Sequence, residues 1–356
     1  MATICALNNY PLKKMWELSQ GGLMPGQHVW GLDALAADGH VIDFAPFHEP
    51  GDRSLLERLS FRTRGVLGHL DQEAYALRRV RSTDVLYCAD QAGLAGIALG
   101  RRVLPTTQLV SVVHHPLGNA VRLATVRRTD TLICLSRTLC SELERALPRR
   151  RATVVHLPWG PDLASPLYEP LGEGNGIVSA GKSNRDLITL AQALAGTESI
   201  AVVYDLERQL AAPPNDSVRV VHPGDPDGID PVSHGAYLAR RVVRDIAASS
   251  IVAIPVRDPG RLTGLTEATD ALALAKPIVA TRSPYFPFDI EAVGCGIWVQ
   301  PGDAQGWARA IRRLLSDPDA RKEMGSTGRR FAEREWNYGS FHAGLSELVS
   351  TPRRQL

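Results

Sequence analysis

Short apolar runs alternate with helical stretches along the first half of the chain. The runs are rich in β-branched residues and are bounded by polar or turn-forming residues, which is typical of buried strands. They are Thr3–Leu7, Val41–Ala45, Asp84–Cys88, Leu109–Val113, Thr131–Leu135 and Thr153–His156. Alternating strand and helix signals predict a parallel, Rossmann-like sheet. Ligands of such sheets bind at the carboxyl ends of the strands.

The same alternation returns in the second half of the chain. Its predicted strands are Gly176–Ala180, Ala201–Tyr204, Val218–Val221, Ile251–Val256, Lys276–Thr281 and Gly294–Val299. The Pro- and Gly-rich stretch before Gly176 has no period of its own, which suits a linker. We therefore expect an α/β protein with two Rossmann-like domains, the first spanning residues 1–165 and the second 166–330.

The first predicted strand is not followed by the Gly-x-Gly-x-x-Gly turn of nicotinamide-binding domains. A long polar connection is expected instead, from Asn8 to Gln20. Gly21 and Gly22 come next and lead into a helix that ends near Gly39. The pattern therefore gives little support to a dinucleotide-dependent oxidoreductase.

A turn after the predicted strand Ile251–Val256 carries the first candidate anion site. It runs from Arg257 to Thr266 and contains Gly264, which would let a ligand approach the backbone closely. Amides at a helix N-terminus favour an anion such as phosphate. Asp270 lies four positions after Thr266 on the same helix face, where its carboxylate would accept hydrogen bonds from ribose hydroxyls. The alternative is a plain turn glycine and a solvated aspartate.

A second loop of the same kind follows the predicted strand Gly176–Ala180. Lys182 and Arg185 flank the start of the next helix, for which Asp186 is the expected N-cap. Two cations beside a helix N-terminus make a diphosphate clamp, because arginine offers a bidentate fork and lysine a point charge. The alternative is a pair of ordinary surface cations.

Three histidines lie where a ligand is expected. His114 and His115 close a predicted strand at its carboxyl end, the edge that faces ligands in a parallel sheet. His28 lies at a helix start after the glycine-rich turn, where it would contact an acceptor. Each also fits a plainer interpretation as a polar residue of a loop or helix turn.

A basic amphipathic segment lies between Leu55 and Arg81. Such a segment can bind an anionic acceptor or a membrane surface. Because Glu57, Asp71 and Glu73 are interspersed among its arginines, we favour a solvated face over a core, with weak peripheral membrane contact as the alternative.

Composition narrows the function classes. A chain of 356 residues favours two domains over one, and a net charge of +2 gives no general case for nucleic-acid binding. No apolar run approaches the roughly 20 residues of a membrane-spanning helix, and the first apolar run is too short for a signal peptide. We therefore expect a cytoplasmic monomer or homodimer. The five cysteines lack metal-ligand or redox spacing, so buried free thiols and no metal site are expected.

The string from Gly264 to Thr281 resembles the donor-site segment of retaining glycosyltransferases of the family-4 type, also called group 1, which have the GT-B fold. It reads Gly-Leu-Thr-x-x-x-Asp-Ala-Leu-Ala-Leu-Ala-Lys-Pro-Ile-Val-Ala-Thr, where the family has a Glu-Ala-Met-Ala-x-Gly-Lys-Pro-Val-Val-Ala-Thr run. The match is specific in its second half. In the first half, Asp270 stands where the family has its ribose-binding glutamate, and Leu262 stands where many members carry another glutamate.

The resemblance implies roles for residues in both halves of the chain. It places Gly181, Lys182 and Arg185 in the family's phosphate-binding loop, and His114 beside the transferred sugar. It places Gly22 in the wall of a cleft between the domains. In the family the last helix crosses back, so residues 331–356 are expected to pack on the first domain.

A site with a donor side and an acceptor side follows from these assignments. The donor side would comprise Gly22, Gly181, Lys182, Arg185, the amides of Gly264, Leu265 and Thr266, and Asp270. The acceptor side would comprise His28 and His115. Lys182, Arg185 and the helix start would stabilise the departing diphosphate, with His114 beside the sugar, so no metal is required.

The sequence therefore predicts an enzyme that moves a hexose-type sugar from a nucleotide diphosphate donor to a small-molecule hydroxyl or amine. The family resemblance implies that the transfer retains the anomeric configuration. A UDP-sugar is the favoured donor, with a GDP- or TDP-sugar as the alternative, and a natural-product aglycone or aminocyclitol is the favoured acceptor. Two alternatives stay open. One is a GT-B sugar-nucleotide epimerase or hydrolase, with His115 or Asp33 as general acid or base. The other is a catalytically silent nucleotide-sugar-binding protein.

Overall fold

The computed structural model divides the chain into two compact units, which are described separately. Unit 1 comprises Met1–Ser19, Gly26–Pro158 and Gly339–Leu356, and unit 2 comprises Gln20–Pro25 and Trp159–Tyr338. The structure describes residues 1–48, 55–63, 69–90, 94–100, 107–118, 120–147, 152–169, 172, 174–222 and 231–350.

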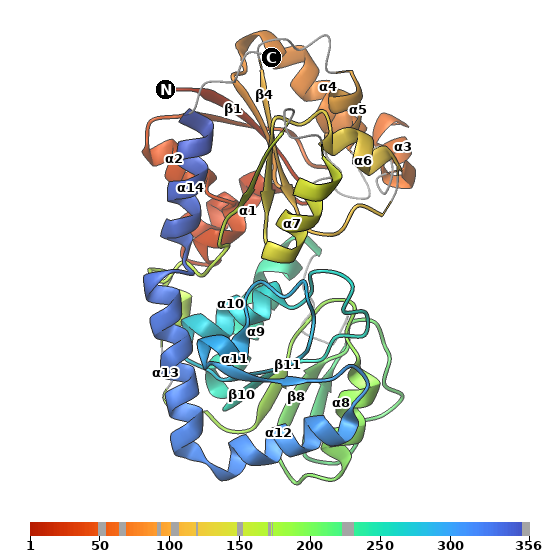
Figure 1. Cartoon of the computed structure of the whole chain (residues 1–356), viewed down its shortest axis with the longest axis vertical. Coiled ribbons are helices and arrows are strands. Elements are labelled where there is room, and N and C mark those ends of the chain that lie inside the picture. The colour runs from red at the N-terminus through yellow and green to blue at the C-terminus, as the bar shows by residue number, and fades with distance from the viewer. Residues whose placement is uncertain are drawn as a thin grey trace. The chain divides into compact units, whose positions relative to one another are not determined.

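Unit 1 is built on a sheet of six parallel strands in the order β2-β1-β3-β4-β5-β6 (Figure 1). The strands are β1 (Thr3–Leu7), β2 (Val41–Phe44), β3 (Val85–Cys88), β4 (Gln108–Val113), β5 (Thr131–Cys134) and β6 (Thr153–His156). The central strands β3, β4 and β5 are buried along their whole length, as expected of a parallel sheet covered on both faces. The predicted apolar runs of the first half are thereby confirmed as strands.

Short helices connect the strands of unit 1. They are α1 (Leu12–Gln20), α2 (Leu32–Ala37), α3 (Leu55–Thr63), α4 (Leu70–Arg79), α5 (Ala95–Leu99), α6 (Ala120–Val126) and α7 (Arg137–Ala146), with 3-10 turns η1 (Gly26–Val29) and η2 (Val80–Ser82). In the basic segment, Arg79 pairs with Asp43 at 2.9 Å and lies over the Tyr75 ring. Arg64 of that segment lies outside the described residues.

The prediction of a polar connection from Asn8 to Gln20 is wrong. Helix α1 occupies most of this stretch, and its face bearing Leu12 and Met15 is buried. Two buried residues three positions apart suffice to dock a nine-residue helix, but they are too few for its period to stand out among polar neighbours.

The C-terminal helix α14 (Tyr338–Ser350) packs on unit 1, beside α2 (Figure 1). Phe341 and Leu345 are fully buried, and a side chain on Gly31 would meet Leu345 at 2.7 Å. His342 lies 2.8 Å from the carboxylate of Asp38, at the end of α2. The last segment of the chain therefore completes the first unit.

Unit 2 repeats the architecture with a second sheet of six parallel strands, in the order β12-β11-β10-β7-β8-β9. They are β7 (Ile177–Ser179), β8 (Ala201–Tyr204), β9 (Val218–Val221), β10 (Ile251–Ile254), β11 (Ile278–Thr281) and β12 (Gly296–Val299). Its helices are α8 (Leu187–Ala195), α9 (Pro231–Ala248), α10 (Leu265–Ala273), α11 (Ile290–Val293), α12 (Ala304–Ser316) and α13 (Pro318–Arg334), with a 3-10 turn η4 (Pro166–Tyr168). The expected α/β class with two parallel sheets is confirmed.

Strand β10 shows how the second sheet is covered on both faces. Ile251 and Ala253 pack with α8 and α12, whereas Val252 and Ile254 pack with α9 and α10. Because alternate side chains leave a strand on opposite faces, one apolar strand supports both helical layers. The chain passes from unit 1 to unit 2 after Pro158, earlier than the 165/166 boundary drawn from the sequence, and returns after Tyr338.

The four cysteines Cys5, Cys88, Cys134 and Cys295 are buried free thiols, and Cys140 is half-buried. Within the described part of the chain, no helix combines the length and apolar character needed to cross a membrane.

Candidate functional site

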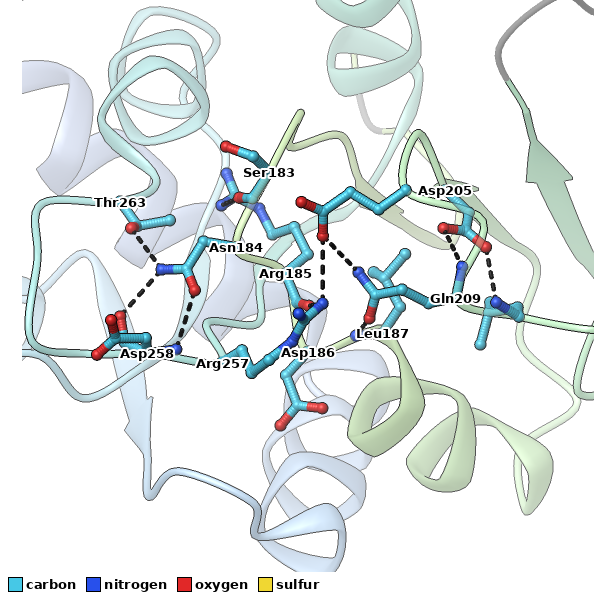
Figure 2. Close-up of polar contacts among 12 residues, drawn as sticks. Ser183, Asn184, Arg185, Asp186, Leu187, Asp205, Gln209, Arg257, Asp258 and Thr263 are labelled. Atoms are coloured by element: carbon cyan, nitrogen blue, oxygen red, sulfur yellow. Dashed lines mark hydrogen bonds and ion pairs between the residues drawn. The ribbon is translucent and has the colours of Figure 1, made fainter. Parts of the chain in front are cut away.

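Three loops meet at the carboxyl ends of β7, β8 and β10, which are neighbours in the sheet (Figure 2). The first runs from Ala180 to Asp186, the second from Asp205 to Leu210, and the third from Pro255 to Gly264. In an open parallel sheet this edge is where ligands bind. The two loops singled out from the sequence are therefore neighbours in space.

Asn184 ties the first loop to the third. Its Nδ2 donates to the carbonyl oxygen of Asp258 and to Oγ1 of Thr263, both at 2.9 Å, and its Oδ1 accepts from the Asp258 amide at 3.0 Å. The residue has a left-handed backbone with φ of 57°, which asparagine tolerates better than most residues. Asn184 was not assigned a role from the sequence, although an asparagine between the two cations was a signal for a left-handed turn.

The second loop joins the same network. The buried Asp205 carboxylate accepts from the amides of Gln209 and Leu210 at 2.8 and 2.7 Å. Gln209 Oε1 accepts from the Leu187 amide at the start of α8, and Arg257 pairs with Glu207 at 3.2 Å (Figure 2). All three loops are therefore linked by hydrogen bonds.

Arg185 is buried and paired, unlike the surface cation considered as its alternative. Its Nη2 donates to Glu267 in the first turn of α10, and its Nη1 donates to the carbonyl oxygen of Ser183 at 2.8 Å. A side chain on Gly181 would lie 1.7 Å from Arg185 Nε. The glycine is therefore required by the guanidinium that packs against it. Glu267 was missed from the sequence, because its partner lies 82 positions away.

Lys182 is exposed, in contrast to Arg185. Asp186 caps α8 as predicted, with its carboxylate accepting from the Thr189 amide at 3.2 Å. The two predicted cations thus differ: Lys182 is a solvent-exposed point charge, and Arg185 is a hydrogen-bonded donor in the interior.

Gly264, Leu265 and Thr266 form the start of α10. Gly264 has φ of 88° and offers no side-chain cap, and a Cβ there would meet Ile254 at 2.4 Å. Leu265 is half-buried and Thr266 is exposed. The helix N-terminus therefore presents amides and a positive dipole end at the same sheet edge as Lys182.

Asp270 lies one turn further along α10, where it is only 2% exposed. Burial raises the pKa of its carboxyl to about 7, against the hydrogen bond that Tyr168 Oη donates to it at 2.7 Å. The nearby Glu267 charge raises this pKa further. Tyr168 comes from η4, far away in the sequence, and no pattern marked it. Leu262, at the other position where the family carries glutamate, is buried.

His114 lies at the carboxyl end of β4 in unit 1. Its Nε2 lies 2.7 Å from the carbonyl oxygen of Ala89, and its ring is 5.1 Å from that of Trp30. Burial lowers the pKa of His114, so the ring is neutral near pH 7, with Nε2 as donor and Nδ1 as acceptor. Trp30 adopts a left-handed φ of 58°, which was not foreseen from the sequence.

The remaining predicted residues belong to different units. His115 is exposed, with its ring 6.2 Å from that of His114, and the half-buried His28 lies in η1, where its carbonyl oxygen accepts from Tyr10 Oη at 2.9 Å. Gly22 belongs to unit 2 and has φ of 67°. The roles expected of these residues stay predictions.

One group of side chains in unit 1 has the composition of a metal site. His48, Glu57 and Asp71 each bring a potential ligand atom within 4.8 Å of the others. Glu57 and Asp71 lie in the first turns of α3 and α4, where acidic residues also complement the helix dipole. That second role accounts for them without an ion, and the expectation of no metal stays a prediction.

Residues 263–331, from the end of the third loop into α13, match the family described as glycosyl transferases group 1. The resemblance inferred from the string at Gly264 is thereby confirmed, and the family is one of glycosyltransferase enzymes.

One relative of this chain is the D-inositol 3-phosphate glycosyltransferase of Corynebacterium kroppenstedtii. It is 36% identical over 132 residues, which cover 36% of this chain and 28% of the relative. The chain thus matches less than a third of that protein's length.

Solved GT-B glycosyltransferases have the same fold as this chain. Sucrose-phosphate synthase from Thermosynechococcus elongatus superposes with a TM-score of 0.69 at 16% identity, over 98% of both chains. HepE of Anabaena, solved with UDP-glucose, superposes with a TM-score of 0.68 at 16% identity, over 98% of this chain and all (100%) of HepE. At this identity the likeness establishes the fold alone.

Proposed function

We propose that this protein transfers a hexose-type sugar from a nucleotide diphosphate sugar to a hydroxyl or amine of a small molecule, with retention of configuration. The observation that carries the proposal is the network joining the loop of Lys182 and Arg185 to the start of α10, where the family segment begins. Two anion-adapted loops joined at one sheet edge suit a diphosphate.

The departing diphosphate would be stabilised by fixed charges and dipoles. Lys182 supplies a mobile positive charge, Arg185 supplies a held donor, and the amides of residues 264–266 supply the positive end of α10. Preorganised donors of this kind stabilise charge that develops in a transition state. On this basis we propose a reaction that requires no metal ion.

The neutral His114 would lie beside the sugar. Its Nε2 is directed to the Ala89 carbonyl and the Trp30 ring packs edge-on against the imidazole, so His114 would meet a sugar hydroxyl as a neutral group. A neutral group orients a hydroxyl without adding charge. His28 and His115 are proposed to contact the acceptor molecule.

Asp270 would accept hydrogen bonds from the ribose, which requires a change in its present hydrogen bonding. In the structure its carboxylate accepts from Tyr168 Oη, so a ribose hydroxyl must either share the carboxylate or replace the tyrosine. A carboxylate has about four lone-pair sites, which allows sharing. We propose a UDP-sugar as donor, in line with HepE, which was solved with UDP-glucose, and a cytoplasmic location.

The silent nucleotide-sugar-binding protein is the second candidate. Two observations favour it. Leu262 is buried where many family members carry a glutamate, and Asp270, which replaces the family's ribose-binding glutamate, already accepts a hydrogen bond from Tyr168. This candidate binds a donor and does not turn it over.

The experiment is a thermal-shift screen of the purified protein against UDP, GDP, TDP and ADP and their common sugars. We expect a shift with one nucleotide, followed by sugar transfer to a panel of small-molecule hydroxyls and amines. A shift without transfer to any acceptor supports the silent binder, and release of free sugar without an acceptor indicates a hydrolase. The absence of any shift would refute the donor site.

A further inference from the structure

Glu267 has no direct role in the proposed reaction. It lies in the first turn of α10 with a side chain 7% exposed, and its partner Arg185 is 5% exposed. Exposed ion pairs contribute little to stability, whereas breaking a buried pair leaves an uncompensated charge in the interior. The pair therefore fixes the guanidinium far more firmly than a surface contact would.

The three nitrogens of Arg185 are used unequally. Nη2 donates to Glu267 and Nη1 donates to the Ser183 carbonyl oxygen. Nε is buried, and among the described residues it has no hydrogen-bond partner. Buried donors are almost always satisfied, so an N–H left over in a side chain held at two other points indicates an acceptor from outside the chain.

The surroundings of Nε indicate what that acceptor is. Nε lies against Gly181, where a Cβ would be only 1.7 Å away, so the unused donor is at the loop after β7. The same loop carries Lys182 and is bonded through Asn184 to the third loop, which leads into α10. A guanidinium N–H, an ammonium and a helix N-terminus together suit the oxygen of a phosphate.

We propose that Glu267 is a positioning residue for donor binding, a role that rests on the proposed function. It holds the Arg185 guanidinium through Nη2, and Nε–H donates to one oxygen of the diphosphate. Because Glu267 also neutralises the arginine, Arg185 contributes a directed hydrogen bond, and Lys182 contributes the net charge.

The test is a double-mutant cycle on the full chain, read as the Kd of the nucleoside diphosphate that stabilises the parent. Glu267→Ala is expected to weaken binding at least tenfold. Glu267→Gln keeps an acceptor oxygen for Arg185 and is expected to stay within about threefold of the parent. In an Arg185→Ala background, Glu267→Ala should cause no further loss, because it acts only through the arginine.

Arg185→Lys tests the same role without changing Glu267. Lysine keeps the positive charge but has no guanidinium and therefore no Nε–H to donate from this position. We expect Arg185→Lys to lose as much affinity for the nucleoside diphosphate as Arg185→Ala. Glu333→Ala is the matched control, since Glu333 pairs with Arg329 on the exposed face of α13. Melting temperatures of all variants separate lost binding from lost folding.

Several results would overturn the role of Glu267. Parent-like or tighter binding by Glu267→Ala would show that the carboxylate is idle or competes with the ligand. The role would also be overturned if Glu267→Ala weakened binding as much in the Arg185→Ala background as in the parent. Full affinity of Arg185→Lys for the nucleoside diphosphate would overturn it too. If the parent binds no nucleoside diphosphate, the proposed function fails and this role with it. If the parent binds and Glu267→Ala binds equally, only the role of Glu267 fails.

Discussion

Replacing Asp270 by asparagine should change stability and donor binding in opposite directions. The carboxyl group is fully enclosed, and burial raises its pKa from 3.8 to about 7. At about 1.36 kcal/mol per tenfold change in acidity, this rise corresponds to about 4 kcal/mol of destabilisation by the ionised form. Asparagine has the same shape and an oxygen to accept from Tyr168, and it carries no charge.

The sign follows from proton linkage. Between about pH 4 and pH 7 the folded state holds a proton at Asp270 that the unfolded state has released, so the free energy of unfolding of the parent falls as pH rises. Above pH 7 that loss is complete. Asp270→Asn should therefore be more stable than the parent by up to about 4 kcal/mol at pH 8, and nearly equal to it at pH 4.

Urea unfolding at both pH values, followed by tryptophan fluorescence, measures this difference. Asp289→Asn is the matched control in the same unit. Hydrogen bonding, chiefly from Trp298 Nε1, lowers the pKa of Asp289, so its replacement should destabilise the protein at pH 8. An Asp270→Asn stability gain that is absent at pH 8, or equal at both pH values, would refute the reasoning.

Donor binding by Asp270→Asn provides the functional half of the prediction. If the carboxylate accepts from ribose hydroxyls, its loss should weaken nucleotide binding by about 1.5–3 kcal/mol, the scale of a hydrogen bond to a charged group. A variant that is more stable and binds the nucleotide as the parent does would remove Asp270 from the donor site.

Three further outcomes are expected. Lys182→Ala should weaken donor affinity by about 1.5–3 kcal/mol in a titration, with little change in melting temperature because the side chain is exposed; unchanged affinity excludes the lysine from the site. Gly264→Ala should destabilise unit 2 by at least about 1 kcal/mol, since its φ of 88° is left-handed and its Cβ would meet a neighbour at 2.4 Å; Gly196→Ala, with open space around its Cβ, is the control in the same urea titration. Cys140 should be alkylated before the other cysteines, because its hydrogen bond with Cys134 lowers its pKa; peptide mass spectrometry after brief iodoacetamide treatment would show a different order if that bond is absent.

The sequence determined the architecture because its signals are local. Short apolar runs rich in β-branched residues predicted every described strand of the two sheets, and the cap at Asp186 followed from its own neighbours. The Lys-Pro-Ile-Val-Ala-Thr string identified the family without reference to any distant residue. Helix α1 was missed because only two of its side chains are buried, which leaves its period too weak to detect.

The candidate site was predicted as a set of residues and a sheet edge, but the state of each side chain depended on partners distant in sequence. The residues next to Arg185 in the sequence do not distinguish a side chain that faces solvent from one that pairs with Glu267. Only folding brings these two residues together across 82 positions. Asp270 was expected to be open to a ribose, and Tyr168, 102 positions earlier, accounts for its actual hydrogen bond. Charge, pKa and hydrogen-bond capacity depend on burial and on neighbours at a few ångströms, so these properties of the site were decided by the tertiary structure alone.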